Sequence, residues 1–98
     1  MIRIYPLDGK MMDSRKNMHA HLYMQFALPE YYGNNLDAFW DCVTEKEPGY
    51  IVISNVECAN RAAFLPLMGL LMVLAARDPR WHVSVETGSR ECECGEQE

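Results

Sequence analysis

Residues 50–53, Tyr-Ile-Val-Ile, limit the possible folds of this chain more than any other stretch. They follow a polar break at residues 45–49 and show no alternation of apolar and polar side chains. A continuous apolar run of this length is typical of a strand at the centre of a parallel sheet. Parallel strands require a crossover connection, which should be right-handed. The run therefore predicts an α/β fold.

Two alternating runs predict the neighbouring strands. Residues 2–5 alternate until a turn signal at Asp8-Gly9, and residues 81–86 alternate so that Val83 and Val85 should face the helices. Alternating outer strands on either side of a continuous central strand predict a three-stranded parallel sheet in the order 1-2-3. We expect a two-layer α/β structure with the helices packed mainly on one face of this sheet.

A first helix is predicted to start after Asp13 or Ser14, either of which can cap it, and to end before Pro29. His19 and His21 fall within this helix. Because they are two positions apart, they point to different sides and cannot chelate one metal ion together. We expect both to be ordinary surface or boundary residues.

A further helix is predicted from Pro66, which suits a first helical turn, to about Arg77. Residues 67–74 are apolar nearly all round, so we expect this helix to be buried. Residues 55–63, before it, should form an irregular turn or a short helix.

The length and charge of the chain limit its function. Its 98 residues, 49% of them hydrophobic, fit a single domain with its own core. We expect this domain at residues 1–88 and an acidic, flexible tail at residues 89–98. A net charge of −5 argues against nucleic acid or an anionic membrane as partner and favours a basic protein. With neither a secretory signal nor a long apolar segment in view, we expect a cytoplasmic protein that is a monomer when free.

Residues 27–44 carry the candidate site, in which a turn-forming loop leads into a short helix. Gly33 can take a positive φ and Asn35 can cap the helix. Two clusters are predicted on neighbouring sides of the helix, one apolar (Leu36, Phe39, Trp40, Val43) and one polar (Asp37, Asp41, Thr44). Such a polar side is usually only a solvated surface. Two tyrosines just before two carboxylates, however, are typical of an interface.

Residues 28–42, LPEYYGNNLDAFWDC, resemble the signature of the barstar family, intracellular inhibitors of ribonucleases. The resemblance implies the same two-layer α/β fold. It also implies an immunity protein that occludes the active site of a secreted or toxic ribonuclease, with an acidic helix and loop that mimic RNA phosphates. The partner would be barnase-like or another ribonuclease toxin. The implied partner-binding residues are Tyr31, Gly33, Asn35, Leu36, Asp37, Trp40, Asp41 and Thr44, with Asp41 the most important.

Two departures from the family pattern suggest a different target from barnase. Lys46 stands where the family has a tryptophan, and a lysine there would repel a cationic enzyme. A carboxylate near the end of the later helix is also missing, with Ala75 or a near neighbour in its place.

Other classes of function fit less well. An acidic interaction module for a basic protein that is not a nuclease would use the same surface and is the alternative. An enzyme is not expected, because two aspartates without a His, a Lys or a metal ligand nearby provide no nucleophile. We expect no cofactor and no metal, since Cys92 and Cys94 form only an isolated Cys-x-Cys pair.

Overall fold

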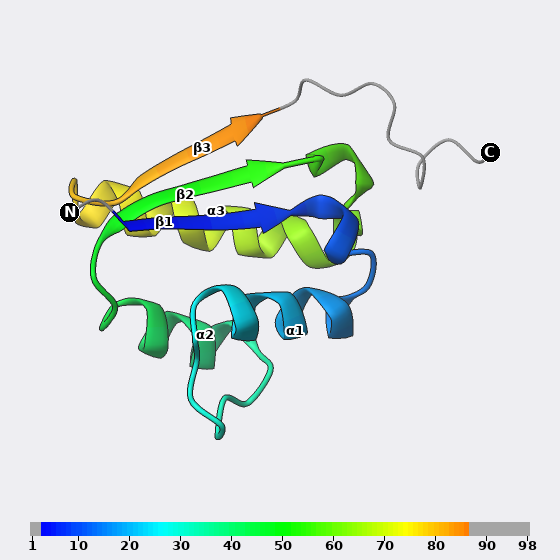
Figure 1. The fold of residues 1–98 in the computed structure, drawn as a ribbon, viewed down its shortest axis with the longest axis horizontal. Coiled ribbons are helices and arrows are strands. Elements are labelled where there is room, and N and C mark those ends of the chain that lie inside the picture. The colour runs from blue at the N-terminus through cyan, green and yellow to red at the C-terminus, as the bar shows by residue number, and fades with distance from the viewer. Residues whose placement is uncertain (1–2, 87–98) are drawn as a thin grey trace.

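The computed structural model describes residues 3–86 and contains one three-stranded sheet (Figure 1). Its strands are β1 (Arg3–Asp8), β2 (Gly49–Ser54) and β3 (His82–Glu86), all parallel and in the order β1-β2-β3. Tyr5 is in register with Ile51, which is in register with Val83. The predicted topology is confirmed.

Helices cover one face of this sheet. The α-helices are α1 (Arg15–Gln25), α2 (Leu36–Val43) and α3 (Arg61–Arg77), and the short 3-10 helices are η1 (Gly9–Met11) and η2 (Val56–Cys58). All three α-helices lie on the same side of the strands (Figure 1). The two-layer α/β architecture is therefore confirmed, as is the short helix expected between residues 55 and 63.

The central strand is buried on one face only, which differs from its prediction, because the other face of the sheet is open. Although β2 is apolar at nearly every position, its burial alternates, with Ile51 and Ile53 fully buried and Tyr50 39% exposed. Tyr50 covers part of the open face by stacking on His82, with ring centroids 4.7 Å apart. Val83 and Val85 follow the register of Ile51 and Ile53 on the helix side, but at the sheet edge Val85 keeps 40% exposure.

Helix α3 differs from its prediction in two respects. It starts five residues before Pro66, because Asn60 caps it by accepting a hydrogen bond from the backbone N–H of Ala63 at 3.0 Å. It is also not buried all round: Leu65, Met72 and Val73 are 59%, 56% and 50% exposed. The apolar run carries no periodicity, so nothing in it revealed that only one side of α3 meets the sheet.

Aromatic side chains hold the layers together and fix the position of α2. Phe26, at the end of α1, stacks on Tyr5 of β1 at 4.6 Å between centroids. The ring of Phe39 from α2 meets Phe26 edge-on at 5.2 Å, and Phe39 is fully buried. This geometry is favourable for aromatic pairs. Helix α2 is thus anchored to the core through Phe39, which leaves its opposite side outside.

Within residues 3–86, no helix is long and apolar enough to cross a bilayer.

Candidate partner-binding surface

Helix α2 starts where its sequence directs it to start. The side-chain oxygen of Asn35 accepts a hydrogen bond from the backbone N–H of Ala38 at 2.8 Å, and its amide donates to the carbonyl of Gly33 at 3.3 Å. At the other end, the Thr44 hydroxyl donates to the carbonyl of Trp40 at 2.9 Å. Asn35 and Thr44, both predicted to bind a partner, therefore also define the ends of the helix.

The outer side of α2 presents two unpaired carboxylates. Asp37 and Asp41 are exposed, and neither forms a salt bridge with any cation in the described part of the chain. Both line one hollow of about 410 Å³ together with Trp40. The structure thus brings the predicted acidic pair to one place on the surface, where it is free to meet cations from outside.

Two further predicted residues support this acidic side. Leu36 and Trp40 are half-buried and pack against the core. The guanidinium of Arg77, in the last turn of α3, lies over the Trp40 ring at 5.9 Å from its centroid. A cation at this distance is attracted by the face of an indole ring. Trp40 therefore joins α2 to α3 as well as facing outwards.

The loop before α2 projects away from the sheet (Figure 1). Tyr31, near its tip, is 86% exposed, whereas Tyr32 is buried and donates its backbone N–H to the carbonyl of Pro29 at 2.9 Å. Tyr31 and Asp41 line the same hollow of about 360 Å³, so loop and helix contribute to one surface.

The predicted positive φ of Gly33 is wrong. Gly33 is exposed and its φ is not positive; the left-handed positions of the loop are Ala27 (φ 51°) and Asn34 (φ 58°). Asparagine tolerates this conformation better than most residues. The turn that Gly33 was expected to make is made one residue later, directly before the cap.

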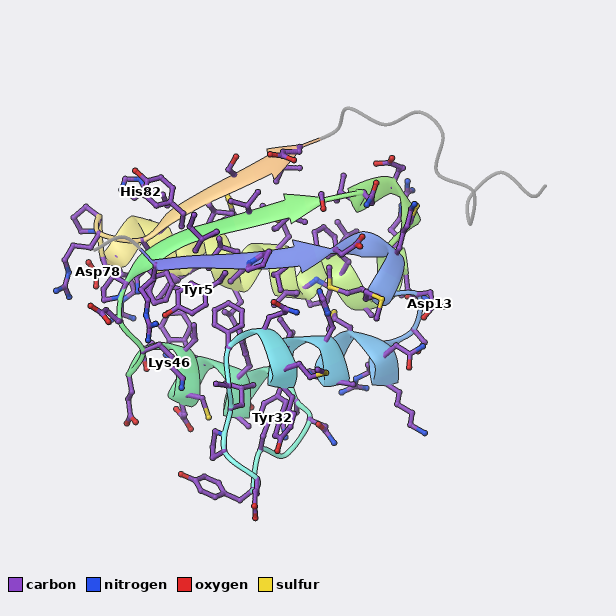
Figure 2. The ribbon with its side chains drawn as sticks, in the orientation of Figure 1. Tyr5, Asp13, Tyr32, Lys46, Asp78 and His82 are labelled. Atoms are coloured by element: carbon purple, nitrogen blue, oxygen red, sulfur yellow. The ribbon has the colours of Figure 1, made fainter. Side chains whose placement is uncertain are left out.

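His19 is buried and supports the loop, contrary to the expectation that it lies at the surface or boundary. Its ring is 2% exposed, and its Nδ1 shares a hydrogen bond of 2.6 Å with the hydroxyl of Tyr32. Figure 2 labels Tyr32, which lies below α1 in that view. Burial, with a smaller effect of Arg15, lowers the pKa of His19, and burial raises the pKa of Tyr32 to about 12. Both groups are therefore neutral near pH 7. Among the described residues, His19 Nε2 has no hydrogen-bond partner.

His21 is also buried rather than at the surface, and its partner lies in the sheet. Its Nε2 accepts a hydrogen bond of 3.0 Å from the backbone N–H of Asp8 at the end of β1. Burial lowers the pKa of His21, although the nearby Asp8 carboxylate acts in the opposite direction. Sequence spacing correctly separated the two histidines, but each has its own structural partner across thirteen residues.

Lys46 is turned back towards the loop. Its Nζ donates to the carbonyl of Ala27 at 3.0 Å, the residue with the left-handed φ, and the side chain is half-buried (Figure 2). The ammonium group thus ties the end of α2 to the start of the loop. The bond to a neutral carbonyl leaves the positive charge in place, and Lys46 lines the same hollow as Tyr31 and Asp41, so the repulsion of a cationic partner that its sequence position suggested still applies.

No cluster of three or more His, Cys, Asp or Glu side chains within residues 3–86 is arranged to hold a metal ion. Cys92 and Cys94 lie outside the described residues, as does the predicted tail at residues 89–98.

Comparison with known proteins gives the chain a family. The family described as Barstar (barnase inhibitor) matches residues 2–90, which is nearly the whole sequence. A protein of Bacillus subtilis (strain 168) named "Putative ribonuclease inhibitor YrdF" is 38% identical over 56 residues. That alignment covers 55% of this chain and 62% of the Bacillus protein, so it spans less than two thirds of the relative. The family match, together with the three-stranded parallel sheet and its helices, shows that the chain belongs to the barstar family.

Proposed function

We propose that this protein inhibits a ribonuclease by covering its active site with the outer side of α2 and the loop before it. The observation that carries the proposal is the pair of exposed, unpaired carboxylates, Asp37 and Asp41, on one side of a helix that is capped and anchored in the core. Family membership and the name of the Bacillus relative support the same function.

The chemistry of the target explains why carboxylates would serve. A ribonuclease binds RNA phosphates with cationic side chains, and a carboxylate can form similar charge-assisted hydrogen bonds with them. Asp37 and Asp41 would therefore take the place of phosphates, and inhibition would result from occlusion without any chemical step. The net charge of −5 favours the approach of such a basic enzyme.

The proposed contact residues are those that the resemblance implies. We divide them into residues that contact the partner directly and residues that shape the surface. Asp37, Asp41 and Tyr31 would make the direct contacts, because they are exposed and their polar side-chain groups form no hydrogen bond or salt bridge within residues 3–86. Trp40 would add apolar area beside the carboxylates. Asn35, Leu36 and Thr44 would contribute mainly by shaping α2, and Gly33 would allow close approach to the loop.

The setting of this activity is part of the same proposal. We infer an immunity protein of a toxin–antitoxin pair that acts in the cytoplasm, is a monomer when free, and uses residues 1–88 as its domain.

Co-expression tests the proposal directly. Barnase and a panel of other secreted bacterial ribonucleases would each be expressed in a host with this protein or its Asp41→Ala variant. We expect the unchanged protein to restore growth against at least one ribonuclease and the variant to restore it less well. A protein that protects against none of the panel, yet binds a basic protein that is not a nuclease, would favour the alternative interaction module.

A further inference from the structure

The outer side of α2 is too small to form a stable interface by itself. The helix has eight residues and is therefore about 12 Å long. A stable protein–protein interface commonly buries about 800 Å² on each partner. A partner that engages Asp37 and Asp41 must therefore also cover what lies beside them, and the structure defines that neighbouring surface.

A continuous depression runs between α2 and α3, which we name the α2–α3 furrow. It consists of two hollows that share Asp37. The first, of about 520 Å³, is lined by the start of α2, by α3 and also by α1, with Arg15, Met18 and His19 from α1 and Ala62, Ala63 and Pro66 from α3. The second, of about 410 Å³, lies between Asp41 and residues Leu70 and Val73. The furrow therefore follows both helices in the same direction.

The first hollow also holds the cation of Arg15 from α1, whereas in the second hollow the α2 and α3 walls differ clearly in chemistry. The α2 wall carries Asp37 and Asp41, whereas the α3 wall contains no charged residue anywhere from residue 62 to residue 76. The α3 wall is accessible as well, because Val73 is 50% exposed and Leu70 only partly buried. The resemblance to the family implied a carboxylate near the end of this helix, and the chain offers an apolar strip instead.

We propose that the bound ribonuclease seats an apolar segment against Leu70 and Val73, immediately beside the cations that meet Asp37 and Asp41. This inference rests on the proposed function and specifies its partner. A cation held against Leu70 and Val73 but out of reach of Asp37 and Asp41 would lose its water without gaining an opposite charge, which is costly. An apolar segment would instead gain by burying Val73. The cognate enzyme is thus distinguished by an apolar rim on one side of its cationic site.

A second copy of this chain is a poor occupant of the same furrow. Two chains of net charge −5 that faced each other there would bring their Asp37 and Asp41 carboxylates together. Like charges juxtaposed across an interface oppose association. The mixed character of the furrow, acidic on one wall and apolar on the other, fits a basic partner.

A new carboxylate at Val73 tests the inference, because it should weaken ribonuclease binding if the partner is apolar there and strengthen it if the partner is cationic. Val73→Glu would be compared with Met72→Glu, whose side chain is similarly exposed, is adjacent in sequence and lines neither hollow of the furrow. Affinity would be measured by titration calorimetry against catalytically inactive barnase or, where barnase is not bound, the panel ribonuclease that binds most tightly. Denaturant unfolding would show that both variants fold.

We expect Val73→Glu to weaken binding by about tenfold or more, because an unpaired carboxylate is buried, and Met72→Glu to change it by no more than about twofold. Unchanged or tighter binding of Val73→Glu would show that cations, not apolar groups, face α3 and would overturn the inference. Equal weakening by both variants would overturn it too, since the furrow would then have no special role. In either case, a loss of affinity in Asp41→Ala would keep the proposed function standing. Failure of the unchanged protein to bind any panel ribonuclease would overturn both.

Discussion

The proposed binding surface combines two segments that are held in place by different means. Helix α2 is fixed locally, by an N-cap bond between residues three apart and by the burial of its own Phe39. The loop at residues 26–35 is fixed from a distance, since His19 of α1 bonds to Tyr32 and Lys46 bonds to Ala27, nineteen residues earlier. The helix is therefore held by its own cap and by packing on the core, whereas the loop depends on hydrogen bonds from α1 and from the segment after α2.

The largest expected effect concerns the helix. Asp41→Ala should weaken ribonuclease binding by about 2–5 kcal/mol, a general range for truncating one member of a buried charge pair to which the barnase–barstar complex itself contributes. Asp41 lines both the hollow that holds Tyr31 and the hollow that holds Asp37 and Trp40, so its loss would leave partner cations buried and unpaired. Asp37→Ala should follow, and Tyr31→Ala, in the loop, should cost less.

Titration calorimetry with the bound ribonuclease would measure these differences. Glu57→Ala is a suitable control, because it removes an equal charge from an exposed position on η2. Affinity that is unchanged in a folded Asp41→Ala variant would contradict the assignment of the binding surface to α2.

The next effect concerns the distant support of the loop. His19→Ala should lower the free energy of unfolding by about 1–3 kcal/mol, since it leaves the buried Tyr32 hydroxyl without its partner and removes a buried ring. It should also weaken inhibition, although His19 makes no contact with the partner. Replacing a histidine at the surface would instead change neither the free energy of unfolding nor the inhibition.

Urea unfolding of His19→Ala, Tyr32→Phe and the double variant would measure the coupling between the two side chains. We expect the two single effects not to add, because each variant breaks the same hydrogen bond. Strict additivity would mean that the contact between His19 and Tyr32 does not support the loop.

The local support of α2 and the distant support of the loop show which features could be predicted from the sequence. The three strands and the Asn35 cap depend on patterns between near neighbours, and the strand order follows from a continuous apolar run between two alternating ones, so all were predicted correctly. The burial of His19 and the tether of Lys46 depend on contacts between residues thirteen and nineteen positions apart, for which a single sequence carries no signal. Leu70 and Val73 were missed for a related reason: an apolar run without periodicity does not reveal which of its residues stay outside.

Acid should weaken the fold through the same histidines. The pKa values of His19 and His21 are lowered by burial from the ordinary value of 6.5, so below that pH the unfolded chain takes up protons that the folded chain resists. The stabilisation is fully present above pH 6.5 and is lost as pH falls from 6.5 towards the folded-state pKa values. Each unit of separation between folded and unfolded pKa values corresponds to about 1.4 kcal/mol.

Unfolding free energies measured between pH 7.5 and 5.5 would show this decline. The double variant His19→Gln, His21→Gln keeps side chains that can accept a hydrogen bond but do not titrate, so its stability should be nearly flat over that interval. An equally steep decline in the double variant would assign the effect to other groups.

The smallest expected effect separates the two carboxylates of α2 from each other. Asp37 lies in the first turn, where the positive end of the helix dipole favours a negative charge; Asp41 lies in the last turn, where the dipole opposes one. Each such interaction is worth about 0.3–1 kcal/mol at low salt. Asp37→Asn and Asp41→Asn both relieve the same repulsion between the two carboxylates, so this contribution cancels when the variants are compared. Asparagine and aspartate also have similar helix propensities.

The free Asp41→Asn protein should therefore be more stable than Asp37→Asn by at least about 0.5 kcal/mol, and the difference should shrink when salt is added. Thermal unfolding at 10 mM and 500 mM NaCl would measure it, and equal stabilities at low salt would contradict it. Both variants should also lose ribonuclease binding. Asp41 would then lower the stability of the helix while contributing to binding, whereas Asp37 would contribute to both helix stability and binding.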